Sequence, residues 1–167
     1  MTFYYSIIGP LFVHLFSAIL CMGFSATFHL FTAHSAEVNN FLSRLDYCGI
    51  SILIAGSNTP PLYYSFFCEE MQGWRNVYMF LQYFFCFCCF VLLLMPRYNK
   101  PEYRTLRGVL FIICGLSSVL PLFHIEFLTH KRYINDFETL PWGLGGALYI
   151  FGAILYVLKF PERLNPG

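Results

Sequence analysis

The sequence predicts an all-α, multi-pass transmembrane helix bundle of about five helices, and three observations support that prediction. Only 11% of the 167 residues are Asp, Glu, Lys or Arg, whereas a soluble domain carries about 25%. In addition, 57% of the residues are hydrophobic and 20% are aromatic. Finally, the few charges are spaced so that five long stretches contain none. A soluble fold could not cover its surface with so few charges, so residues 1–167 are interpreted as a single transmembrane domain.

The charge-free stretches are long enough to cross a bilayer. They run from Met1 to Ala36, Tyr47 to Cys68, Asn76 to Pro96, Gly108 to Ile125 and Thr139 to Leu158. A membrane helix needs about 20 largely apolar residues, and the last four stretches are 22, 21, 18 and 20 residues long. They are continuously apolar rather than alternating, which favours helices over a β-barrel. Helices are therefore expected at about 10–34, 46–67, 75–96, 107–125 and 140–159.

Prolines suggest where several of these helices begin or bend. The first stretch is too short for two crossings and a turn. Because Pro10 suits a first helical turn, residues 1–9 are expected to form a short interfacial lead before the first helix. Pro60, Pro61 and Pro121 lie within or near the ends of their stretches, where proline is expected to end or kink a membrane helix.

The basic residues predict how the chain is oriented. Seven of the ten bases fall between the first and second, between the third and fourth, and after the fifth stretch: Arg44, Arg97, Lys100, Arg104, Arg107, Lys159 and Arg163. The opposite side has Arg75, Lys131 and Arg132. The positive-inside rule then places the N-terminus outside and the C-terminus in the cytoplasm, in a plasma membrane or an endomembrane.

Three polar residues are expected to converge within the membrane near the cytoplasmic face. His29 lies four residues after Ser25, so the two side chains share one helix face. Asp46 is expected to open the next helix after a short turn, at the depth of His29. Imidazole is a common zinc ligand, and a nearby carboxylate can orient or deprotonate a metal-bound water. An interhelical hydrogen bond that simply joins two helices explains the same residues, and residue types alone leave both readings open.

Several collinear motifs resemble one known family. They are Ser25-Ala26-Thr27-Phe28-His29, Leu45-Asp46-Tyr47-Cys48-Gly49-Ile50, Tyr63-Tyr64-Ser65-Phe66, Gly115 to Pro121 with His124, and Pro161-Glu162-Arg163. Together they cover nearly the whole chain. The sequence is similar to the progestin and adiponectin-Q receptor family, to its adiponectin receptors in particular, and to the related haemolysin-III proteins.

The resemblance implies a metal site and a larger fold. In that family a zinc ion is held by a histidine that matches His29, with the residue that matches Asp46 contacting the metal through water. Two further histidines come from the last helix, which would lie beyond Gly167. The chain is therefore expected to correspond to helices two to six of a truncated seven-helix fold, as a fragment or a short form.

The resemblance also implies a function. It points to a receptor whose complete fold could hydrolyse ceramide-like lipid amides, with Asp46 as the general base and Ser25 as a hydrogen-bond donor. The expected partners are the lipid bilayer, a ceramide-like lipid or hormone ligand and, in a homo-oligomer, further copies of the chain. The alternatives are a non-catalytic membrane protein that shares the bundle, or a haemolysin-III-like pore. A net charge of +1 without a basic cluster argues against nucleic-acid binding.

The remaining histidines and cysteines are weaker candidates. His34 is too far around the helix from His29 to share a metal easily, and His14 either lines a polar cavity or packs alone. His124 is expected at the outer interface. The cysteines of the third stretch, Cys86, Cys88 and Cys89, are interpreted as small packing residues because their apolar setting does not suit redox chemistry.

Overall fold

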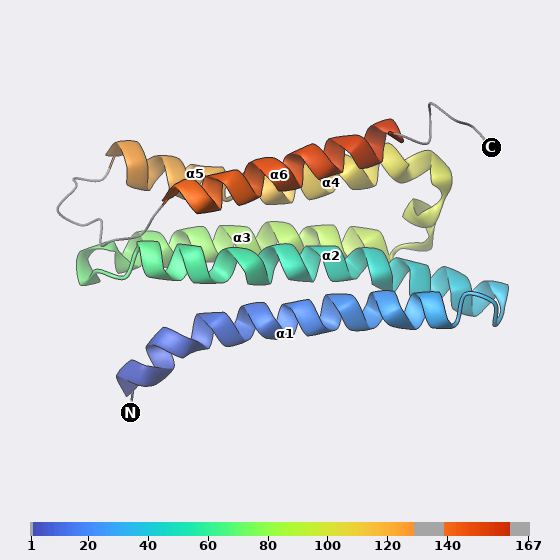
Figure 1. Cartoon of the computed structure of the whole chain (residues 1–167), viewed down its shortest axis with the longest axis horizontal. Helices are drawn as coiled ribbons and strands as arrows, with labels where there is room; N and C mark the ends of the chain where they lie inside the picture. The colour runs from blue at the N-terminus through green and yellow to red at the C-terminus, as the bar shows by residue number, and fades with distance from the viewer. Residues whose placement is uncertain (1, 129–138, 161–167) are drawn as a thin grey trace.

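The computed structural model describes residues 2–128 and 139–160, and within these ranges the chain is helical. The long helices are α1 (Thr2–Leu30), α2 (Ala36–Ser65), α3 (Gln72–Leu94), α4 (Arg104–Leu116) and α6 (Thr139–Leu158). A short α5 (Val119–Phe123) and a π-helix (His124–Leu128) continue the line of α4. Successive long helices run antiparallel, so the first turn of α1 and the last turn of α6 lie at opposite ends of the bundle (Figure 1). This is the all-α bundle of five helices that the sequence predicts.

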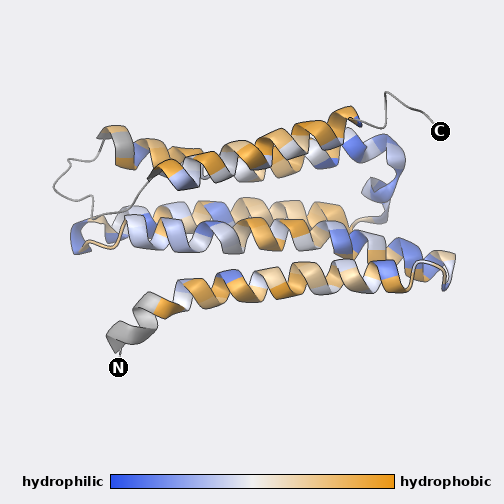
Figure 2. Ribbon diagram, viewed as in Figure 1, coloured by the Kyte–Doolittle hydropathy of each residue, from blue (hydrophilic) through white to orange (hydrophobic). Residues whose placement is uncertain are grey.

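Among the residues that the structure describes, four segments are long and apolar enough to cross a membrane: Ile8–Leu30, Glu69–Leu94, Pro101–Phe123 and Leu140–Leu158. Their outward surfaces are largely apolar, while hydrophilic residues gather at the two ends of the bundle (Figure 2). This is the pattern expected when the middle of the bundle faces lipid and its ends face water.

Helix α2 is more polar because it lies among its neighbours. It packs on α1, α3 and α4. Its buried Ser51, Asn58 and Thr59 each donate a hydrogen bond to an α2 carbonyl, and the Thr59 hydroxyl also lies 2.7 Å from the Tyr83 hydroxyl. Polar side chains satisfied in this way are tolerated inside a bundle where they would not be tolerated against lipid.

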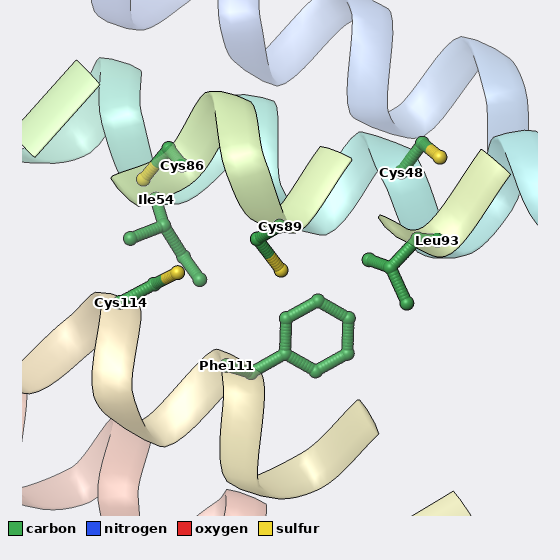
Figure 3. Packing of buried hydrophobic residues seen from close by; sticks show 7 residues of the cluster. All are labelled: Cys48, Ile54, Cys86, Cys89, Leu93, Phe111 and Cys114. Atoms are coloured by element: carbon green, nitrogen blue, oxygen red, sulfur yellow. The ribbon is translucent and has the colours of Figure 1, made fainter. Parts of the chain in front are cut away.

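The core is made of side chains from α2, α3 and α4, and most of them are small or medium in size (Figure 3). It contains Cys48, Ile54, Cys86, Cys89, Leu93, Phe111 and Cys114. The cysteines are free thiols. Cys86 and Cys89 thus pack in the bundle interior, while Cys88 is half-buried.

Two helix starts differ from the sequence expectation. Helix α1 begins at Thr2, so Pro10 lies inside it rather than opening it. Helix α2 begins at Ala36 rather than near Asp46, because Ser35 caps it: the backbone N–H of Val38 donates to the Ser35 hydroxyl at 3.3 Å. Asp46 therefore lies within α2 and does not open it. Pro60 and Pro61 lie inside the last turns of α2, close to its end at Ser65.

The charge-free stretch from Gly108 to Ile125 is interrupted near Pro121, where the sequence predicts an end or a kink. α4 ends at Leu116, where the backbone tightens and the N–H of Ser118 donates to Gly115 O at 3.3 Å. The buried Gln82 of α3 faces this break, and its side-chain amide donates to Cys114 O at 3.3 Å. The Ser117 hydroxyl lies 2.6 Å from Gln82 Oε1. A neighbouring side chain thus bonds a backbone carbonyl, that of Cys114, next to the break.

Candidate functional site

The polar residues singled out in the sequence lie on α1 and α2, and two glycines set how closely these helices approach. A Cβ atom placed on Gly49 would lie 3.1 Å from Cys21 Cα. A Cβ placed on Gly56 would overlap the side chain of Ser17. Small residues at such crossings let helix backbones come together, and here they allow α1 and α2 to approach closely.

This contact brings Asp46 to the level of Ser25. Asp46 lies three residues before Gly49, and Ser25 lies four residues after Cys21, on helices that run antiparallel (Figure 1). Residues three or four apart share a helix face, so each is one turn away from the Gly49–Cys21 contact in the same direction. Both residues are half-buried. A carboxylate and a hydroxyl therefore lie across one helix interface.

His29 is in a different environment. It lies one further turn along α1, about 6 Å beyond Ser25. It is exposed, and its ring lies 5.1 Å from that of Phe28. The expectation that His29 and Asp46 both face the interior stays a prediction for His29. Among the described elements α1 packs chiefly on α2, which leaves its other flanks uncovered by this part of the chain.

These residues do not complete a metal site by themselves. A catalytic zinc ion uses three protein ligands and a water. In the part of the chain that the structure describes, no three His, Cys, Asp or Glu side chains come together to hold a metal ion. The donor types fit zinc, but their number does not.

The other histidines lie away from this group. His34 is exposed in the turn between α1 and α2, beside Phe31. His124 lies at the opposite end of the bundle, where its Nδ1 atom is 2.8 Å from the Tyr78 hydroxyl and Trp74 meets its ring edge-on. It thus sits among aromatic residues at the end of the bundle, as an interfacial histidine would.

Sequence reasoning left open whether His14 lines a cavity, and it missed two buried amide side chains, Asn58 and Gln82. A cavity of about 640 Å³ is bordered by α1, α2, α4, α5 and α6, with His14 and Asn58 in its wall. Asn58 and Gln82 are neutral, so a pattern based on charged groups and histidines does not include them. A neutral amide inside an apolar stretch itself indicates a position facing other helices, since it needs a hydrogen-bond partner when lipid surrounds the helix.

Comparisons with known proteins agree with this fold. Over 151 residues the chain is 39% identical to an adiponectin receptor protein of Drosophila melanogaster, covering 90% of this chain and 34% of that protein. It is 36% identical over 156 residues to a heptahelical transmembrane protein of Oryza sativa subsp. japonica, covering 93% of this chain and 41% of that protein. An ADIPOR-like receptor of Saccharomyces cerevisiae is 36% identical over 151 residues, covering 90% of this chain and 47% of that protein.

The chain therefore spans between about a third and a half of the length of these relatives. The haemolysin-III related family matches residues 5–167, which is nearly the whole chain. With this match and with four apolar segments long enough to cross a membrane, the chain is a multi-pass membrane protein that belongs to the haemolysin-III related family.

Proposed function

We propose that the chain is the membrane core of an adiponectin receptor-like protein and that Ser25, His29 and Asp46 form one wall of an intramembrane zinc site. The observation that supports this most is the position of Asp46. A half-buried carboxylate beside a tight helix contact is costly in a membrane bundle unless it has a function or a partner. The relatives named as adiponectin receptors and as heptahelical transmembrane proteins indicate the class of protein.

Each residue has a separate role in this proposal. His29 would be the ligand, since a neutral imidazole binds zinc directly. Asp46 would hold and deprotonate a water molecule, and Ser25 would donate a hydrogen bond to the substrate. When bound, zinc supplies a Lewis acid and an acidic water, which suits hydrolysis of a ceramide-like lipid amide. Because His29 and Asp46 are too few to hold zinc alone, the other ligands would have to come from residues outside those described.

A non-catalytic role is the second candidate, and the exposure of His29 favours it. In that case Ser25 and Asp46 would stabilise the contact between α1 and α2 and no metal would bind. Since polar groups often join membrane helices, this alternative needs a direct test.

Zinc content in two versions of the protein separates the candidates. One is this chain, and the other continues through whatever the gene encodes after Gly167; both are purified in detergent and assayed for bound metal. The extended protein should contain about one zinc per chain and lose it on His29→Ala, because a tetrahedral site cannot spare a ligand. His34→Ala, which removes an exposed histidine in the neighbouring turn, should leave the zinc content unchanged.

A second variant tests the role of the carboxylate. Asp46→Asn should weaken zinc binding by only about 10- to 100-fold, as for groups that contact a metal indirectly. Hydrolysis of a lipid amide should fall much further than zinc occupancy does, because Asn cannot accept a proton. Absence of zinc from both versions would favour the non-catalytic alternative.

A further inference from the structure

The connection between α3 and α4, together with the first turn of α4, is strongly basic. From residue 96 to residue 107 there is one acid, Glu102, and there are four bases. The bases are Arg97, Lys100, Arg104 and Arg107. Hydrophilic residues gather here, at the end of the bundle where α6 finishes (Figure 2). Because Arg107 immediately precedes the charge-free stretch that begins at Gly108, these bases lie at the boundary between hydrocarbon and water, where lipid headgroups are found.

Arg107 differs from the other three bases because its side chain is buried, with only 4% of the residue exposed. Its Nη1 atom donates to Tyr98 O at 2.7 Å and to Lys100 O at 3.0 Å. Its guanidinium lies over the ring of Tyr47, 4.5 Å from the ring centre. These contacts hold the guanidinium in place, but none of them carries a full negative charge. Burying a cation without a counter-charge is unfavourable, so the surroundings of Arg107 favour an anion.

The free edge of the Arg107 guanidinium has the shape that an oxyanion requires. Its Nε atom is buried and has no hydrogen-bond partner. The two backbone carbonyls both bond Nη1, which leaves Nε and Nη2 for another acceptor. The N–H groups of Nε and Nη2 point in the same direction, and such a pair donates two parallel hydrogen bonds to one carboxylate or phosphate group. An oxyanion on this edge would satisfy Nε and balance the charge of Arg107 together.

Arg104 adds a second positive charge beside this edge. Its Nε and Nη2 atoms donate to Tyr156 O at 3.1 Å and 2.8 Å, and its guanidinium lies over the Tyr156 ring, 4.4 Å from the ring centre. A carbonyl and a ring leave the charge of Arg104 unbalanced, as they do for Arg107. Residues three apart share a helix face, so both arginines attract an anion at the start of α4.

The position of these arginines indicates which oxyanion they would meet. Phosphate groups of lipids are concentrated at the membrane surface, and bases beside a membrane helix attract anionic lipids. A phosphate group also matches the forked donors of arginine better than it matches the single ammonium of lysine.

We propose that the Nε–Nη2 edge of Arg107, with Arg104 beside it, binds a phosphate group at the end of the bundle where α6 finishes. The phosphate can belong to the headgroup of an anionic phospholipid or be free in the water phase, and the recognition chemistry is the same. The proposal is independent of the zinc site, since it needs neither His29 nor Asp46.

Native mass spectrometry of the unmutated chain, released from detergent micelles, tests the proposal without a substitution. The probes are phosphatidylglycerol, its neutral methyl phosphotriester, phosphatidylcholine and inorganic phosphate. One phosphatidylglycerol should be retained per chain at about 10-fold lower concentration than the triester, the factor expected for one charge-assisted hydrogen bond. Displacement of the lipid by inorganic phosphate would show that the site takes the free anion, and resistance to displacement would identify the lipid headgroup as the source.

Arg107→Lys and Arg97→Lys are a matched pair of variants because both keep the positive charge. Arg107→Lys removes the forked edge but can still donate to the carbonyls of residues 98 and 100, so retention of phosphatidylglycerol should fall about 10-fold in a folded protein. Arg97 is exposed and its Nε donates to the Tyr103 hydroxyl at 3.3 Å, so Arg97→Lys should leave retention unchanged. Helix content and elution volume show whether each variant is folded.

Three results would overturn the proposal. The first is equal retention of phosphatidylglycerol and its neutral triester by the unmutated chain. The second is equal retention of phosphatidylglycerol by folded Arg107→Lys and Arg97→Lys, which would show that charge alone attracts the lipid. The third is loss of this retention in a protein that continues after Gly167, which would show that a group of the protein itself occupies the edge of Arg107. None of these results bears on zinc binding, so the two proposals can fail separately.

Discussion

Gly56 determines how closely α1 approaches α2, and its replacement by alanine is the sharpest single-residue prediction. The new Cβ would overlap Ser17, whose hydroxyl is held by a hydrogen bond to His14 O at 2.7 Å. The helices would have to move apart, so Gly56→Ala should lower the free energy of unfolding by about 1–3 kcal/mol. Unfolding in detergent, followed by the loss of helical circular dichroism with temperature or denaturant, measures this effect.

Gly23→Ala is the control for Gly56→Ala. Gly23 lies on the same helix pair, but an added Cβ there meets no atom within 4 Å. Alanine forms helix better than glycine by up to about 1 kcal/mol, so this variant should be as stable as the parent or more so. Equal destabilisation by the two substitutions would show that steric overlap at Gly56 is not the cause.

At the level of single residues, the sequence predicted part of the candidate site. The short turn between the helices led to the expectation that Asp46 lies at the depth of His29, whereas the α1–α2 contact brings Asp46 level with Ser25, one turn earlier on α1. The exposure of His29 could not be expected, since spacing along α1 does not reveal which flank a neighbouring helix covers. The role of Gln82 at the break after Leu116 also needed the fold, because α3 and α4 are brought together only by packing.

Among the helices, α2 provides a prediction about its first turn. The Ser35 hydroxyl accepts a hydrogen bond from the N–H of Val38, one of the amides that a helix start leaves without a partner. Ser35→Ala should therefore lower stability by about 1 kcal/mol. Ser35→Asp keeps an acceptor at the same place and should retain most of the stability. Chemical unfolding of the three proteins side by side checks the order, and a Ser35→Asp variant as unstable as Ser35→Ala would contradict it.

The start of α2 also shows why helix bounds were harder to predict than helix number. The charge-free stretches reveal where hydrocarbon can surround the chain, but α2 begins at Ala36, well before that region. The sequence feature that indicates this helix start is Ser35 as an N-cap residue, followed by Glu37 in the first turn. For α1, the assumption that Pro10 opens the helix was wrong because proline is tolerated inside a membrane helix.

For the whole molecule, we propose that all five antiparallel long helices of the described residues cross the membrane, which would place the first turn of α1 and the last turn of α6 on opposite sides. Seven of the ten bases belong to the segments at the end where α6 finishes, so the C-terminus is expected in the cytoplasm. A reporter that is active only outside the cytoplasm should work when fused to the N-terminus and fail at the C-terminus. The reverse pattern would refute the orientation, and equal activity at both ends would refute five crossings.

The polarity of α2 has a consequence for how the protein is made. In the described part of the chain, four segments are long and apolar enough to cross a membrane, and none of them contains α2. Its buried Ser51, Asn58 and Thr59 would meet lipid if it left the translocon alone. Because α1 is apolar and is joined to α2 by a short turn, the two can leave the translocon together as a hairpin. Biogenesis of the bundle would then begin with a pair of helices, and α1 would act as the membrane anchor that admits the more polar α2.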